Sequence, residues 1–145
     1  MHSMTSAQNM LESIAAEVLA APVVGEKEVY RIGDLAREFD VSLRTLRFYE
    51  DRGLISPTRS GSTRLYSPED RTRLKVILLI KSVGFSLVDI QELLAIYDGD
   101  GAEAGVKKIR KKFGDQLESL RDQKSQVEQS INDLEKAIAT IGNTF

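Results

Sequence analysis

Apolar residues recur every seven positions through the C-terminal third of the chain. The first series consists of Val106, Phe113, Leu120, Val127, Leu134 and Ile141. A second series, four positions after members of the first, consists of Leu117, Ile131 and Ile138. Spacings of seven and four are those of the a/d seam of a coiled coil, here sustained over about five heptads. The pattern predicts one long dimerisation helix over residues 103–145.

The predicted seam is too long for a small domain to cover. A single amphipathic helix packed on the globular core is the alternative, but about 36 residues at ~1.5 Å per residue span roughly 54 Å. Arg110 and Lys124 fall at seam positions, where polar side chains set the register of paired helices. We therefore expect a homodimer, with the helices antiparallel because only Gly142 to Phe145 follow the seam.

Upstream, the pattern predicts two short helices that meet at a tight turn. The i, i+3, i+4, i+7 spacing of one buried helical face is met by Ile32, Leu35, Ala36 and Phe39. Ser42 is a suitable N-cap for the second helix, because its hydroxyl can accept a hydrogen bond from an unpaired backbone amide. Gly53 should end that helix after about Arg52. Two helices joined by about three residues form a helix-turn-helix.

A loop or short hairpin and two further helices should follow. Gly53 to Tyr66 contains Pro57 and Gly61, which favour turns. Ser67 and Ser86 are N-caps for the two helices. The first of these helices is apolar on nearly all sides and should form the core through Leu74, Val76, Ile77, Leu78, Leu79 and Ile80. The second carries Leu87, Ile90, Leu93, Leu94 and Tyr97.

Residues 1–29 form an N-terminal extension with one candidate helix. Met1-His2-Ser3, ahead of Met4, looks like a vector remnant. Helical spacing between Asn9 and Ala20 relates Met10, Leu11, Ile14, Val18 and Leu19, and Pro22 and Gly25 follow. A helix this short is marginal in water by itself. It therefore packs on the body, packs on a partner or frays.

The composition excludes several kinds of chemistry. The chain contains no Cys, and its one histidine is His2. Disulfides, Cys nucleophiles and the sensing of zinc, mercury or copper through thiolates are therefore excluded. We find no nucleophile–His pair, metal cluster or phosphate-binding glycine loop, so we expect neither an enzyme nor a cofactor or metal site. Asp98-Gly99-Asp100-Gly101 lacks the later ligands of a calcium loop, and residues 98–102 are interpreted as a linker.

The sequence favours a cytoplasmic protein. No apolar run approaches the roughly 18 residues needed to span a bilayer, so no membrane partner is expected. Glu12 and Glu17 lie where a signal peptide would carry positive charge.

Positive charge is concentrated in one part of the chain. Residues 30–82 hold eleven Lys and Arg against seven Asp and Glu, whereas the rest holds nine against fifteen. In the second predicted helix, Arg44, Arg47 and Phe48 are neighbours on the face opposite Leu46. Arginine can bind guanine edges or phosphates, and an aromatic side chain can pack on sugar or on a thymine methyl. This face and the loop arginines predict contact with DNA, although an ordinary solvated charge pattern is the alternative.

Three segments resemble the MerR family of transcriptional regulators. They are IGDLAREFDVSLRTLRFYEDRGLISPTR, RLYSPEDRTRL and KSVGFSLVDIQELL. The resemblance implies an all-α fold with a small β-hairpin wing: a winged helix-turn-helix domain over residues 30–97, followed by a long antiparallel coiled-coil helix. A narrower resemblance is to the subgroup that controls branched-chain amino-acid and acyl-CoA catabolism, and it lies in LAREFDVSLRTLRFYEDRGL, SGSTRLYSPEDRTRLK and LLAIYD.

The resemblance also implies a set of DNA-binding residues. In the recognition helix these are Ser42, Arg44, Arg47, Phe48 and Tyr49, with a structural role as the alternative for Tyr49 because it lies nearer the Leu46 face. In the wing they are Arg59, Arg64 and Tyr66, and near the end of the third helix Lys81 matches a backbone contact. The wing departs from the family's usual Asn-Gly-Tyr-Arg, since this chain has Gly61-Ser62-Thr63-Arg64, which keeps the turn but leaves Thr63 in doubt as a DNA ligand.

The resemblance implies a dimeric regulator that binds double-stranded promoter DNA, distorts it when a non-metal effector binds, and works with RNA polymerase. The geometry of the dimer would impose this deformation on the DNA, at a cost on the order of several kcal/mol. The alternative is a coiled-coil interaction module whose helix-turn-helix binds another protein. Arginine-rich faces serve that purpose too, and the acidic remainder of the chain suits it.

Overall fold

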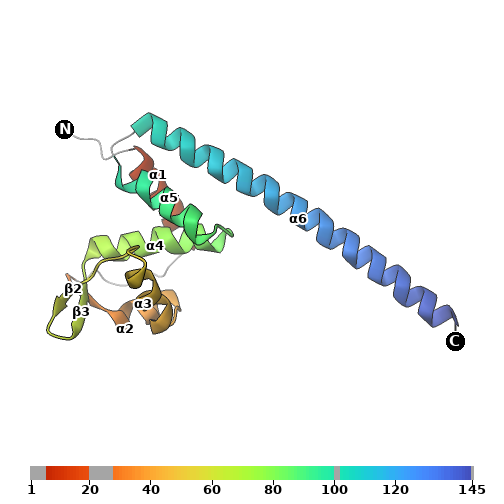
Figure 1. Cartoon of the computed structure of the whole chain (residues 1–145), viewed down its shortest axis with the longest axis horizontal. Helices are drawn as coiled ribbons and strands as arrows, with labels where there is room; N and C mark the ends of the chain where they lie inside the picture. The colour runs from red at the N-terminus through yellow and green to blue at the C-terminus, as the bar shows by residue number, and fades with distance from the viewer. Residues whose placement is uncertain (1–5, 20–27, 100–101, 145) are drawn as a thin grey trace. The chain divides into compact units, whose positions relative to one another are not determined.

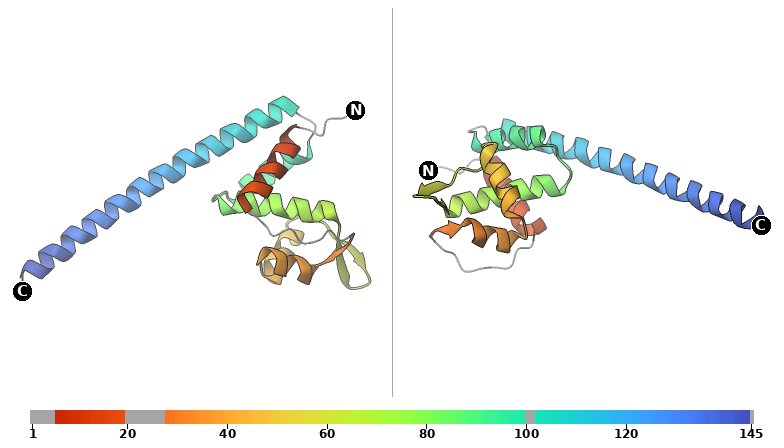
Figure 2. Two further views of the ribbon diagram at one scale, coloured as in Figure 1. Left: turned by 180° about the vertical axis from the view of Figure 1, so that it is seen from behind. Right: turned by 60° about the horizontal axis from the view of Figure 1, so that its bottom comes forward.

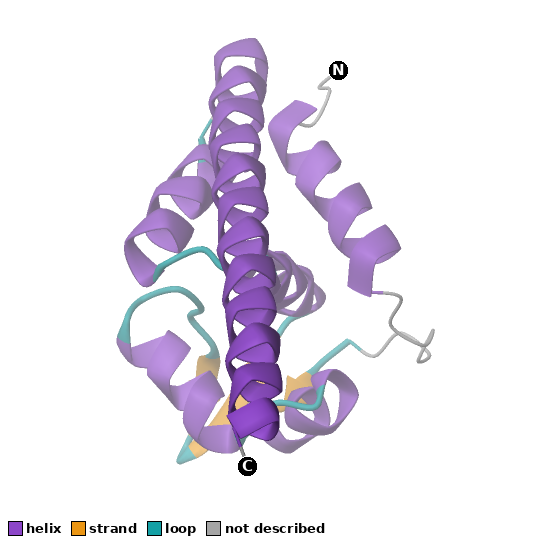
Figure 3. Ribbon diagram, turned by 90° about the vertical axis from the view of Figure 1, so that its right-hand side faces the viewer, coloured by secondary structure: helices purple, strands orange, loops and turns teal. Residues whose placement is uncertain are grey.

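The computed structural model describes residues 6–19, 28–99 and 102–144. Three predicted features lie outside this range: the leader Met1–Ser3, the helix stop at Pro22 and Gly25, and positions 100 and 101 of the linker. The chain forms two compact units, Met1–Ile109 and Arg110–Phe145. Six helices and three short strands are described, and the strands form one small patch in an otherwise helical chain (Figure 3). The predicted fold class is thereby confirmed.

Most elements of the first unit begin and end where the sequence predicts. In chain order they are α1 (Ser6–Leu19), β1 (Tyr30–Arg31), α2 (Ile32–Phe39), α3 (Leu43–Asp51), β2 (Thr58–Ser60), β3 (Thr63–Tyr66), α4 (Pro68–Ser82) and α5 (Leu87–Asp98). The last helix, α6 (Ala102–Thr144), begins in the first unit and forms the second.

The helix-turn-helix is formed by α2 and α3. Asp40 ends α2 in the left-handed conformation, at a φ of 52°, which Asp tolerates better than most residues. Ser42 caps α3 as predicted, because its hydroxyl accepts a hydrogen bond from the Thr45 amide at 3.0 Å. Gly53, at a φ of 73°, reverses the chain after α3. The two helices therefore meet at the short turn that the sequence indicates.

The wing is a hairpin with a third strand beside it. Strands β2 and β3 pair antiparallel, with Ser60 opposite Thr63, so Gly61 and Ser62 form a two-residue loop. Gly61 has a φ of 63°, which such a loop favours. Strand β1 pairs with the other edge of β3, with Tyr30 opposite Tyr66. The sequence did not predict β1, because two residues carry no recognisable periodicity.

The core of the first unit is organised around α4, which lies between α1 and α5 on one side and α2 and α3 on the other (Figures 1 and 2). The buried residues of α4 are Leu74, Val76, Ile77, Leu79 and Ile80. Both predicted N-caps are present, each within a capping box, Ser67 with Asp70 at α4 and Ser86 with Asp89 at α5. The predicted core helix is confirmed, with Leu78 less buried than expected.

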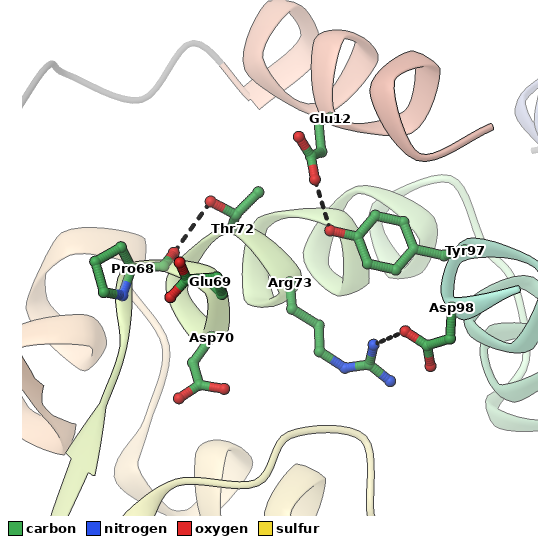
Figure 4. Close-up of a pocket in the computed structure, with 8 residues that line it drawn as sticks. All are labelled: Glu12, Pro68, Glu69, Asp70, Thr72, Arg73, Tyr97 and Asp98. Carbon is green, nitrogen blue, oxygen red and sulfur yellow. Dashed lines mark hydrogen bonds and ion pairs between the residues drawn. The ribbon is translucent and has the colours of Figure 1, made fainter. Parts of the chain in front are cut away.

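Helix α1 packs on the body, which was one of the three alternatives left open by the sequence. Leu11 and Ala15 are buried, and α1 contacts both α4 and α5. The Tyr97 hydroxyl at the end of α5 donates a hydrogen bond to the Glu12 carboxylate at 2.7 Å (Figure 4). The helix begins three residues earlier than predicted.

The second unit is the remainder of α6, and it carries an exposed apolar stripe. Phe113 is half-buried, whereas seven further large apolar side chains are 38–67% exposed: Leu117, Leu120, Val127, Ile131, Leu134, Ile138 and Ile141. Helix α6 has 43 residues without a break, as the heptad pattern predicts. Within the described parts of the chain, no helix combines the length and the apolar character required to cross a membrane.

Candidate nucleic-acid interface

Helix α3 separates an apolar face from a cationic one. Leu46 is fully buried, whereas Arg44 and Arg47 are exposed and Phe48 is 43% exposed. The guanidinium of Arg52 lies 5.1 Å from the centre of the Phe48 ring, a cation–π contact one helical turn along. Neither Arg44 nor Arg47 has an ion-pair partner among the residues that the structure describes. Their guanidinium groups are therefore available to a ligand.

A carboxylate that the sequence did not single out joins the wing to α3. Glu50 accepts hydrogen bonds from Arg59 at 2.9 Å and from Arg64 at 2.5 Å. Burial raises the pKa of the Glu50 carboxyl, but hydrogen bonds and charge attraction from the two arginines outweigh burial, and the pKa lies below its ordinary value of 4.5. The same hydrogen bond acts in the opposite direction on its donor and raises the pKa of the Arg64 guanidinium. Glu50 thus fixes the direction of both wing arginines.

This link should weaken in acid. Because the pKa of Glu50 is lower in the folded chain than in the unfolded chain, its stabilisation is present above pH 4.5 and is lost as the pH falls through the folded value. Urea unfolding from about pH 6 to about pH 3 should show the wild type losing its advantage over Glu50→Gln. A difference between the two proteins that stays constant across this range would contradict the assignment.

Two predicted contact residues lie beneath the surface. Tyr49 is 3% exposed and Tyr66 is 1% exposed. Both hydroxyls are buried and have no hydrogen-bond partner among the described residues. Burial raises the pKa of Tyr66, and Lys81 lies with its ammonium 5.8 Å from the centre of the Tyr49 ring. The structure thus places both tyrosines as supports under the cationic face, while Lys81 is exposed at its edge.

A shallow groove connects α3 to the helix pair behind it. Its volume is about 330 Å³, and its lining includes Arg44, Phe48 and Tyr49 from α3 and Lys81 and Phe85 from the end of α4 and the turn after it. The structure therefore brings four of the nine predicted DNA-binding residues to one concavity. Ser42 lies at the start of α3, where its hydroxyl is engaged in capping.

A hollow of opposite character lies between α1, α4 and α5. Its volume is about 460 Å³, and its lining carries four carboxylates, from Glu12, Glu69, Asp70 and Asp98, against Arg73 (Figure 4). Arg73 is ion-paired with Asp98 and also donates to the Leu54 carbonyl. The acidic lining of this hollow contrasts with the arginines of α3 and the wing.

An ion pair that the sequence did not reveal holds α2 against α4. The Arg71 guanidinium donates to both carboxylate oxygens of Glu38, in each case from Nε at 2.9 Å, and a further bond runs from Nη2 to Oε1. The two side chains are 13% and 6% exposed. Arg71 also lies 5.6 Å from the ring centre of Tyr30 and 5.9 Å from that of Phe39. This arrangement positions the helix-turn-helix on the core.

The helix pair, hairpin and core helix define a winged helix-turn-helix protein. Residues 30–95 match the family described as "MerR HTH family regulatory protein", and residues 71–143, half of the chain, match "MerR, DNA binding". The chain belongs to the MerR family. Helix α1 precedes both matched segments.

Individual relatives agree with this family. Over 93 residues the chain is 36% identical to the mercuric resistance operon regulatory protein of Pseudomonas fluorescens, a match to 63% of this chain and 65% of that protein. The chain therefore spans less than two thirds of the length of such curated relatives. These relatives are regulatory proteins and not enzymes, which agrees with the prediction that this chain is not an enzyme.

Solved structures resemble the fold over most of the chain. A MerR family transcriptional regulator from Bacillus cereus has a TM-score of 0.62 at 26% identity, over 74% of this chain and 78% of that one. The N-terminal part of MtaN, the multidrug transporter activator of Bacillus subtilis, has a TM-score of 0.60 at 29% identity, over 75% of this chain and 97% of that one.

Proposed function

We propose that the protein is a dimeric, sequence-specific DNA-binding transcriptional regulator that acts at a promoter. The observation that carries this proposal is the exposed pair Arg44 and Arg47 on α3, beside a hairpin whose arginines are directed by Glu50. A helix of this kind enters the major groove, where arginine reads guanine bidentately. The family to which the chain belongs supports the same function.

The remaining predicted residues surround this helix. Arg59, Arg64 and Lys81 contact the phosphate backbone and orient the protein on the duplex, and Ser42 acts through the start of α3. Tyr49 and Tyr66 act from below, with buried hydroxyls that no described residue satisfies. Phe48, held under Arg52, contributes an apolar contact to sugar or to a thymine methyl.

The exposed stripe on α6 supports the dimer. Seven large apolar side chains on one helical stripe are more than an isolated helix leaves in water, and their heptad spacing suits an antiparallel partner helix. A dimer holds two α3 helices at a fixed separation, so DNA that does not match this separation must bend or untwist. In this proposal the distortion presents the promoter to RNA polymerase.

The proposed effector is not a metal sensed through thiolates, because the sequence contains no Cys. The resemblance to regulators of branched-chain amino-acid and acyl-CoA catabolism supports an organic effector or acyl thioester from that metabolism. Thermal unfolding of the DNA complex with candidate acyl-CoA thioesters tests this, because a ligand that binds the folded state raises the unfolding temperature. No shift with any of them would set the subgroup aside.

Replacing Arg47 by Ala should weaken binding to a palindromic duplex from the protein's own upstream region by about 1–3 kcal/mol and relax sequence preference. The loss follows from removing a bidentate base contact. Fluorescence anisotropy with cognate and random duplexes at several salt concentrations measures it. Lys111→Ala is the control, since Lys111 is 76% exposed and pairs only locally with Asp115.

Two results would contradict the proposal at different levels. Unchanged binding by Arg47→Ala would reject the site while leaving DNA binding intact. Equally negligible affinity of the wild type for cognate and random duplexes at low salt would instead favour the coiled-coil protein-interaction module.

A further inference from the structure

A second groove, of about 390 Å³, lies on the other side of α3, between the start of α2 and the tip of the hairpin. Figure 2 shows α2 beside the hairpin, and the two elements are in contact. Four arginines line the groove: Arg31, Arg37, Arg47 and Arg64. Among the described residues of its lining, Asp34 is the one acid, so the groove carries an excess of positive charge.

The four arginines are not equally engaged. Arg31 and Arg47 have no ion pair within the described ranges 28–99 and 102–144. Arg37 is 77% exposed and donates to Asp34 at 2.9 Å, while Arg64 is held by Glu50. The remaining lining adds the hydroxyls of Ser62 and Thr63 at the hairpin tip, which are further donors. A ligand that satisfies this lining must be an anion with several acceptor oxygens.

We propose that this groove seats a phosphodiester group of the DNA backbone, with Arg31 and Arg37 as phosphate contacts in addition to those of α3 and the hairpin. The proposal rests on the proposed DNA-binding function. Arg47 is shared between the exposed face of α3 and this groove, so the phosphate lies next to the bases that α3 reaches. Arginine suits such a seat because its planar guanidinium matches two phosphate oxygens at once.

Asp34 competes with a bound anion for the groove's arginines. Its carboxylate accepts from the Arg31 amide at 2.8 Å, which caps α2, and from the Arg37 side chain at 2.9 Å. Without DNA it holds Arg37 and partly neutralises the groove. A phosphate therefore competes with Asp34 for Arg37, and removing the negative charge favours the phosphate.

Arg31→Ala and Arg37→Ala should each weaken DNA binding roughly tenfold. For each variant, the loss should be equal for cognate and random duplexes. The slope of log affinity against log salt should fall by about 0.9 for each phosphate contact removed. The preference for cognate over random DNA should not change. Lys111→Ala removes the same charge from a local pair on α6 and should leave affinity and slope as in the wild type.

Asp34→Asn should change affinity in the opposite direction. The amide oxygen still accepts from the Arg31 amide, but the negative charge is gone, so affinity for both duplexes should rise about three- to tenfold at low salt. Partial unfolding lowers affinity and does not raise it, so this variant separates a phosphate seat from a merely structural role of the cluster.

The outcomes distinguish this proposal from the one on which it rests. If the wild type binds DNA and Arg31→Ala and Arg37→Ala bind equally well, the groove is not a phosphate contact, although the regulator proposal stands. If the wild type binds no duplex, both proposals fail. Calorimetric titration with inorganic phosphate is a third arm. Tight phosphate binding that both variants abolish without affecting DNA affinity would assign the groove to a small soluble anion and overturn the DNA contact.

Discussion

Replacing Leu120 and Val127 together by Asp should convert the protein to monomers and lower its affinity for a duplex with two half-sites by about 10²–10⁴-fold. Both side chains lie in the exposed stripe of α6, at 38% and 57% exposure in a single chain. In the proposed dimer they face the partner helix, where a carboxylate would lose its hydration without gaining a counter-ion. The two winged helix-turn-helix domains then bind their half-sites independently, and the gain in affinity from joining them is lost.

Light scattering measures the first effect, because the mass should fall to the 16.2 kDa of one chain. Anisotropy with one-site and two-site duplexes measures the second. Ser119→Asp with Ser125→Asp is the matched control, since it adds the same charge on the outward face of the same helical segment. A dimer that persists in the Leu120 and Val127 variant would show that the heptad seam is not the interface.

The sequence could predict most of the fold because local signals and long-range packing agree. Ser42, Ser67 and Ser86 each precede a helix and cap it through a side-chain oxygen, as the pattern of caps indicates. The heptad series needs no tertiary information, and α6 is continuous where it runs. In contrast, β1 forms only because Tyr30 and Arg31 pair with β3, and α1 is held by contacts with α4 and α5, which lie far from it along the chain.

The candidate site was predictable as far as helix geometry alone determines it. Arg44, Arg47 and Phe48 share an exposed face because positions three and four apart are neighbours on any helix. Glu50 could not be identified, since its partners Arg59 and Arg64 are nine and fourteen residues away and meet it only after the hairpin folds back. Tyr49 lies near the Leu46 face of its helix, which indicates burial, whereas no local pattern around Tyr66 shows that its side chain is buried.

The groove at Arg31 and Arg37 is visible only in the structure, because the packing of α2 beside the hairpin creates it. Neither arginine stands out in a chain with 20 Lys and Arg. They form part of one groove only when α2 packs beside the hairpin and brings them to Arg47 and Arg64. A concentration of like charge without enough nearby acid disfavours the free state, and an incoming phosphate relieves it.

Glu38→Ala should destabilise the first unit by about 3–5 kcal/mol, a large part of the usual stability of a domain. The substitution leaves the Arg71 guanidinium buried against Tyr30 and Phe39 with its carboxylate gone. Arg71→Lys should also be costly, because an ammonium cannot make two parallel bonds to Glu38 and stack between the rings at the same time. Urea unfolding followed by circular dichroism measures both effects.

The double variant Glu38→Leu with Arg71→Met makes the test specific. Replacing both partners removes the buried charge together with its carboxylate, so the double change should cost less than the sum of Glu38→Leu and Arg71→Met measured singly, and the difference gives the coupling between the two residues. The exposed pair Lys111–Asp115 is the control, and its loss should cost no more than about 0.5 kcal/mol. Single and double changes that simply add would show that Glu38 and Arg71 do not act together. Because this pair joins α2 to α4, its loss should also loosen the turn that presents α3, so affinity for DNA should fall with stability in Glu38→Ala and recover in the double variant.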